Sequence, residues 1–179
     1  MKYLYIDRKL NLEQRDLIKR FETLHLNQQA AERRFLDDRK VRAAEMDGIR
    51  PKRALLFPDG MTEYSCLTPR FQTNSKGDQK VESRFIGIEV YCGPIKTVFI
   101  YRTDALIFHG ADIMIEVIRQ AMIDLCKLLR KRSLLTPREL WLQFDNSGEN
   151  KNKEMFAYLS LLVEDSYFDL VEVLEFHND

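Results

Sequence analysis

Residues 140–176 read LWLQFDNSGENKNKEMFAYLSLLVEDSYFDLVEVLEF and contain two apolar segments separated by a polar turn and a helical pattern. Residues 140–144 carry no charge, which is typical of a strand buried in the interior of a sheet. Residues 155–163 repeat apolar side chains at helical spacing, and residues 169–176 return to a strand-like pattern. This succession predicts strands that alternate with helices packed on a sheet.

Three further strands are predicted upstream, at residues 54–57, 85–91 and 97–101, because these segments are short, apolar and rich in aromatic or β-branched residues. The last two are joined by a short Gly-Pro segment, which is typical of a hairpin. Residues 112–131 carry an apolar stripe that predicts an amphipathic helix of about five turns. The whole order predicts an α/β fold, with a mixed five-stranded sheet and flanking helices.

A helical arm is predicted before this domain. Residues 11–46 contain no Gly or Pro and are rich in residues that favour helix, so they predict one long helix or a helical pair. Asp47-Gly48 is expected to end it, with Gly48 as the left-handed cap. Its apolar stripe of Leu17, Phe21 and Leu24 is too narrow to be buried throughout. We therefore divide the chain into an arm at 1–53 and an α/β domain at 54–179.

Composition bounds the function. The 179 residues suffice for one domain with an appendage, and 28 lysines and arginines balance 28 aspartates and glutamates. The balance is uneven along the chain, since residues 1–53 hold 14 basic and 9 acidic side chains, whereas residues 139–179 hold 2 and 10. A basic arm could contact DNA phosphates, and an acidic end could hold cations. Three cysteines without a C-x-x-C pair, and no membrane-length apolar run, favour an intracellular protein outside the membrane.

Two aspartates follow predicted strands and form the candidate site. Asp145 follows residues 140–144, and Asp59 follows residues 54–57. In a sheet ordered 3-2-1-4-5 these strands are neighbours, so the carboxylates would meet, and two close carboxylates need a cation between them. Mg²⁺ or Mn²⁺ fits such oxygen ligands and serves phosphoryl transfer. The polar residues after Asp145 are possible supporting groups: Asn146, Asn150, Lys151 and Asn152.

A structural alternative exists for each aspartate. Pro58-Asp59-Gly60 is also a common tight turn, and Asp145-Asn146 could be a turn that caps the next helix. Pro58 further removes a backbone donor from a predicted central strand, so we expect frayed pairing near Asp59. Residue types alone favour these alternatives when each aspartate is taken singly.

The block after Leu140 resembles a large family of uncharacterised eukaryotic proteins that transposable elements encode. It carries that family's succession of strand, Asp145-Asn146, Asn150-Lys151-Asn152, helix and strand, and looser agreement extends upstream to about residue 20, including Asp59-Gly60-Met61. The family's core is regarded as an RNase H-like integrase or transposase domain. The resemblance implies that Asp59 and Asp145 are the first two members of an acidic, metal-binding triad.

The resemblance implies a metal-dependent polynucleotidyl transferase or nuclease that acts on DNA in the nucleus, with a homo-oligomer possible. Relatives continue past the last strand into a His-rich segment and a helix with further acidic or polar site residues, whereas this chain stops at Asp179. The third ligand is then missing unless Glu175 or Asp179 substitutes, so the fragment could be inactive. The alternative is a catalytically dead module, derived from a transposable element, that binds nucleic acid or a protein.

Overall fold

The computed structural model describes residues 12–60, 83–104, 110–144 and 152–174. These residues form an α/β fold with three helices and a mixed five-stranded sheet, which confirms the predicted fold class at this level. The elements are α1 (Leu12–Ala43), β1 (Met46–Asp47), β2 (Arg50–Pro51), β3 (Arg53–Gly60), β4 (Ser83–Cys92), β5 (Ile95–Asp104), α2 (Ala111–Lys131), β6 (Glu139–Gln143), α3 (Lys153–Glu164) and β7 (Leu170–Leu174).

The five-stranded sheet has the order β5-β4-β3-β6-β7, which is the predicted order 3-2-1-4-5 of the five strands. β3, β4 and β5 are antiparallel, whereas β6 runs parallel to β3 and β7 runs parallel to β6. The tight β4–β5 turn is made by Gly93, whose φ of 54° suits a residue without a side chain. Parallel neighbours need long crossover connections, and α2 and α3 lie in the two that lead to β6 and β7.

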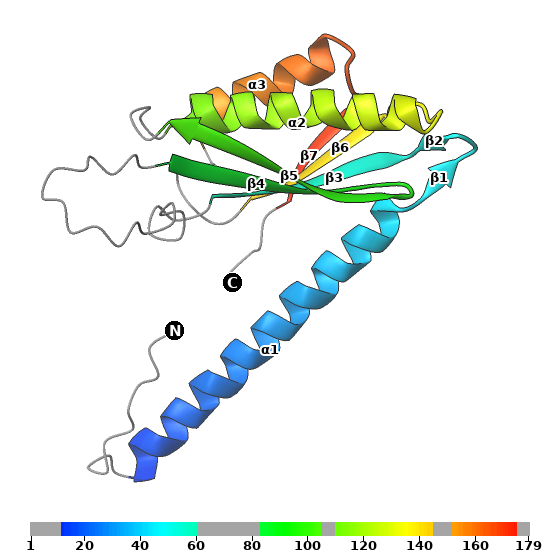
Figure 1. Cartoon of the computed structure of the whole chain (residues 1–179). Helices are drawn as coiled ribbons and strands as arrows, with labels where there is room; N and C mark the ends of the chain where they lie inside the picture. The colour runs from blue at the N-terminus through cyan, green and yellow to red at the C-terminus, as the bar shows by residue number, and fades with distance from the viewer. Residues whose placement is uncertain (1–11, 61–82, 105–109, 145–151, 175–179) are drawn as a thin grey trace, which may run out of the picture. The chain divides into compact units, whose positions relative to one another are not determined.

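Both α2 and α3 cover the same face of the sheet (Figure 1). Alternation along the strands divides the buried side chains between the two faces. Leu56 and Leu142 belong to the cluster that packs with α2 and α3, whereas Leu55 and Trp141 belong to a smaller cluster with Tyr91. β3 and β6 are therefore apolar on both sides, as the uncharged segment 140–144 predicted for β6.

By its contacts the chain divides into two compact units, residues 1–39 and 40–179. This division falls earlier than the predicted boundary at residue 53. In the first unit, the α1 side chains of Leu17, Phe21 and Leu24 are more than half exposed, in agreement with the prediction of a narrow apolar stripe.

The predicted end of the first helix is wrong. α1 ends at Ala43, and Gly48 (φ 59°) makes the turn between β1 and β2 instead of capping the helix. The physical reason is that the backbone N–H of Gly93 donates to the carbonyl of Ala43 at 2.8 Å, so the sheet's own hairpin caps the last turn of the helix.

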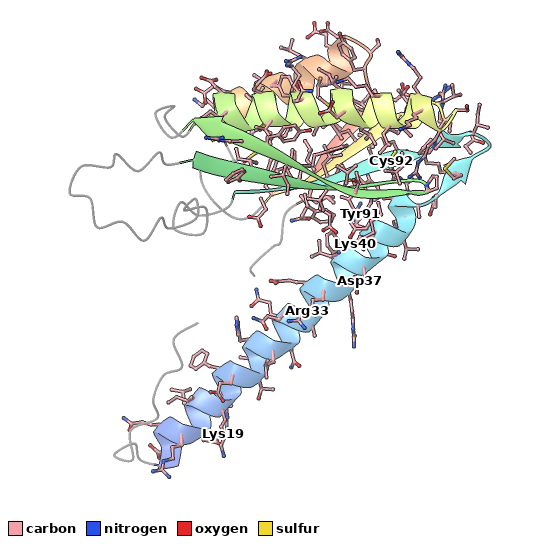
Figure 2. All side chains as sticks on the ribbon, viewed as in Figure 1. Lys19, Arg33, Asp37, Lys40, Tyr91 and Cys92 are labelled. Atoms are coloured by element: carbon pink, nitrogen blue, oxygen red, sulfur yellow. The ribbon has the colours of Figure 1, made fainter. Side chains whose placement is uncertain are left out.

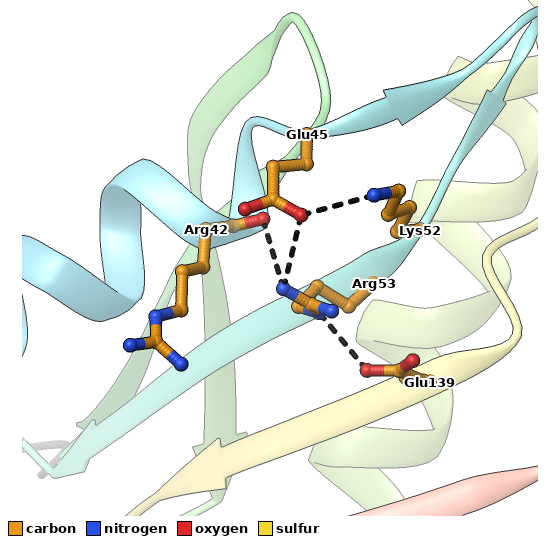
Figure 3. A network of polar contacts seen from close by, with 5 residues as sticks. All are labelled: Arg42, Glu45, Lys52, Arg53 and Glu139. Carbon is orange, nitrogen blue, oxygen red and sulfur yellow. Dashed lines mark hydrogen bonds and ion pairs between the residues drawn. The ribbon is translucent and has the colours of Figure 1, made fainter.

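A polar network holds residues 42–53 against the sheet within the second unit (Figure 3). Arg53 Nε donates to Glu139 Oε2 at 2.9 Å across β3 and β6, and its Nη1 lies 3.4 Å from Glu45 Oε2. Glu45 also accepts from Lys52 Nζ at 3.3 Å. Since the Arg53 side chain is only 15% exposed, this network fixes the start of the central strand β3.

Candidate functional site at the carboxyl ends of β3 and β6

Asp59 lies at the end of β3 and is exposed. It pairs with Gly87 of β4, and the ladder continues to Gly60 opposite Ile86. Toward β4 the expected fraying near Asp59 is therefore absent. Toward β6 the pairing ends at Leu56, before Pro58 and Asp59, so among the described residues this side of β3 is unpaired near Asp59.

The parallel strand beside β3 leads to the second candidate aspartate. The β3–β6 register aligns Leu56 with Leu142. Asp59 lies three residues after Leu56 in the sequence, and Asp145 lies three residues after Leu142. Asp145 itself lies outside the described residues, as do Asn146, Asn150 and Lys151, so the separation of the two carboxylates stays a prediction.

Gln143 is a feature of this region that sequence reasoning missed. Its side chain is 5% exposed and lies in β6, two residues before Asp145. Gln143 Nε2 donates to the carbonyl of Phe144 at 3.2 Å, while Oε1 has no hydrogen-bond partner among the described residues. A buried acceptor left without a partner costs about 1–3 kcal/mol. The signal was visible, since Gln143 is the one polar residue of the strand LWLQF.

Asn152, one of the possible supporting residues, has a structural role at the start of α3. It is the N-cap of α3, and its Oδ1 accepts from the backbone N–H of Met155 at 2.8 Å. A side-chain oxygen at this position satisfies one of the free donors of the first helical turn. The alternative interpretation of Asp145-Asn146 was a turn that caps the following helix. In the structure that helix, α3, begins after Asn152, which is its cap.

The carboxylate and amide oxygens near the ends of β3 and β6 suit a hard cation as ligands, but the described residues contain only part of a metal site. They contain no group of three or more His, Cys, Asp or Glu side chains that could hold a metal ion. Asp59 is the one predicted ligand among the described residues. On β6, the side-chain acceptor nearest to Asp145 in the sequence is the amide oxygen of Gln143, which has no partner among the described residues. Carboxylate and amide oxygens are ligands that Mg²⁺ and Mn²⁺ accept. These residues fit such an ion in chemistry.

The sheet face opposite α2 and α3 carries cations over aromatic rings. Lys40 Nζ lies 5.2 Å from the ring centroid of Tyr91, and Lys96 Nζ lies at the same distance from that ring. The Arg53 guanidinium lies 4.5 Å from the Trp141 ring. Figure 2 shows Lys40 and Tyr91 on this side of the sheet and Cys92 on the other. Such contacts contribute about 0.5–1 kcal/mol each when exposed.

The fold and these side chains define a class: an α/β domain with a mixed sheet, covered by two helices on one face and carrying cations and aromatic rings on the other. Residues 73–176 match a family described as a domain of unknown function (DUF7869). Because the match spans more than half of the chain, this chain belongs to the DUF7869 family. The matched residues include Asp145 and begin after Asp59.

A search of curated proteins found no match to the chain, and a search of solved structures found none either. Among the described helices, none combines the length and the apolar character that crossing a membrane requires.

Proposed function

We propose that residues 54–179 form an RNase H-like domain of the transposase or integrase type, which acts on DNA with Mg²⁺ or Mn²⁺ bound by Asp59 and Asp145. The order and directions of the strands support this proposal, because three antiparallel strands are followed by two parallel ones with a helix before each. Such a protein would work in the nucleus.

A single observation carries the proposal: the parallel β3–β6 pair in the middle of the sheet. Ligand and catalytic groups of α/β sheets gather at the carboxyl ends of the strands, where neighbouring chains separate. The alignment of Leu56 with Leu142 puts Asp59 and Asp145 at the same number of residues beyond the pair. By alternation along the two strands, Asp59 and Asp145 have the same parity as Leu55 and Trp141, so both are expected on the face opposite the helices.

The chain's own residues would bind the cation and position DNA. Asp59 and Asp145 supply carboxylate oxygens, and Gln143 Oε1 can accept a hydrogen bond from a water molecule beside them. A divalent ion bound there would polarise a phosphate and lower the pKa of an attacking water. Lys40, Lys96 and Arg102 lie along the same side of the sheet and would contact the phosphate backbone.

A second candidate function is binding of nucleic acid without catalysis. The exposed basic side chains on this face, such as Lys96, favour it through contacts with phosphates, whereas the rings of Tyr91 and Trp141 are buried and cannot stack on bases. This function needs neither carboxylate. The first candidate therefore predicts that replacing Asp59 or Asp145 abolishes function, whereas the second predicts that DNA binding survives the same replacement.

Calorimetric titration of Mn²⁺ into the full chain tests the first candidate. We expect weak binding that both Asp59→Asn and Asp145→Asn abolish, and that the control Asp47→Asn in the β1–β2 turn leaves unchanged. Asp145→Asn should also raise the melting temperature in metal-free buffer, because it removes a like charge beside Asp59. Unchanged Mn²⁺ affinity in both site variants would refute the metal site. DNA binding that survives both substitutions, with no Mn²⁺ binding by the wild type, would support the second candidate.

A further inference from the structure

The apolar stripe of α1 follows the repeat of a coiled coil. α1 is one continuous helix (Figure 1), and positions of the stripe are spaced alternately by four and three residues. In the heptad notation abcdefg, the a positions are Gln14, Phe21, Gln28 and Phe35, and the d positions are Leu17, Leu24 and Ala31. A stripe confined to a and d is the narrow seam of a coiled coil, whereas a helix that packs on a globular core has a broader apolar face. We call these seven positions the seam.

The middle of the seam is exposed in the single chain. Leu17 is 54% exposed, Phe21 is 63% exposed and Leu24 is 64% exposed. They lie on successive turns, so they form an apolar ridge about 10 Å long. Helices in proteins owe most of their stability to the packing of such a face. The spacing of the ridge therefore fits a second helix as its occupant.

The seam is complementary to a second copy of itself. In an antiparallel pair, each a position lies opposite a d position of the other helix. When Phe21 is aligned with Leu24 of the second copy, the symmetry of the pair repeats this apolar contact. Gln28 then lies opposite Leu17, and its Nε2 donates to Glu32 Oε1 of its own helix at 3.2 Å. The amide nitrogen thus stays hydrogen-bonded while the apolar stem of Gln28 packs in the seam.

The charges beside the seam select the antiparallel direction. Antiparallel helices bring their g positions together, and in this alignment Glu13 lies beside Arg34 of the second copy, twice in each dimer. Neither of these two side chains has an ion pair with another described residue. A parallel pair would instead place Arg34 beside Arg39 of the second copy, where like charges repel. Charges at e and g positions set the direction and the partner of a coiled coil.

We propose that α1 forms an antiparallel homodimer through a coiled coil over residues 13–34. This segment is about 33 Å long, or about three heptads. Because the seam is short, we expect monomer and dimer to exchange at micromolar concentrations. The dimer does not depend on the proposed metal chemistry, so neither Asp59→Asn nor Asp145→Asn should change it.

Sedimentation equilibrium of the full chain measures the dimer. The apparent mass should rise with concentration from 21.2 kDa toward twice this value. Phe21→Glu should leave a monomer, because it places a carboxylate in the seam. Leu26→Glu is the matched control, since Leu26 is also 63% exposed but occupies an f position on the outer side of the pair. A wild type that stays monomeric, or equal dissociation by Leu26→Glu and Phe21→Glu, would overturn the proposal.

A charge exchange tests the direction of the helices. Arg34→Glu should weaken the dimer several-fold, because Glu13 of the second copy would then face a carboxylate. Adding Glu13→Arg to this variant should restore the dimer, since the pair is rebuilt with its charges exchanged. In a parallel dimer Arg34→Glu would face Arg39 and tighten association. Tighter association of Arg34→Glu, or no restoration by the second substitution, would therefore refute the antiparallel homodimer.

Discussion

The thiol of Cys92 should make the domain lose stability in alkaline solution. Cys92 is completely buried at the end of β4, on the face that packs with α2. Burial raises its pKa from the ordinary value of 9.0 to about 12, and the nearby Cys126 thiol adds to the shift. The unfolded chain ionises this thiol near pH 9, whereas the folded chain keeps it protonated up to about pH 12.

The sign and the size follow from this difference. Between pH 9 and about pH 12 the unfolded state binds fewer protons than the folded state, so the free energy of unfolding falls as the pH rises. The contribution of Cys92 is complete below pH 9 and is lost above it. At about pH 10.5 the unfolded thiol is about 1.5 units past its pKa, which corresponds to a loss of about 2 kcal/mol from this group.

Urea unfolding at pH 8 and pH 10.5 measures this loss, with the fluorescence of the buried Trp141 as the signal and a reductant present. Cys92→Ala leaves a small cavity, but that cost is the same at both pH values. The wild type should therefore lose about 2 kcal/mol more than Cys92→Ala between the two values. Cys126→Ala, at an exposed thiol, is the matched control and should change the pH dependence less. An identical pH dependence in the wild type and Cys92→Ala would refute the reasoning.

Two further pairs of substitutions test the local structure. Gly93→Ala should destabilise the domain by clearly more than Gly48→Ala. Both glycines have a positive φ, which costs an alanine about 1–2 kcal/mol. Only at Gly93 would the new Cβ also collide with Met46 Sδ and approach Pro51 Cγ to 3.1 Å. Equal unfolding free energies for these two variants would contradict this account of the β4–β5 turn. Asn152→Ala should cost about 1 kcal/mol by removing the α3 cap, while Asn152→Asp should retain most of it, and urea unfolding distinguishes the two.

The strands and their order could be predicted because periodicity and chain connections are local properties. The uncharged strand at 140–144 required burial on both faces, and the hairpin at Gly93 required β4 and β5 to be neighbours. The end of α1 could not be predicted in this way. Its cap comes from Gly93, fifty residues away in the sequence, and no local pattern around Ala43 contains that contact.

In the candidate site, too, local features could be predicted from the sequence, and features that depend on long-range packing could not. The position of Asp59 followed from the predicted β3, because a strand end is a local feature. The role of Asn152 did not, since several residues between 145 and 152 can cap a helix and the choice depends on where α3 packs. Gln143 was overlooked although its strand was predicted to be buried, because the sequence does not show whether a single polar side chain finds a hydrogen-bond partner. In the structure its Oε1 has none among the described residues, with β7 paired beside it at Leu174.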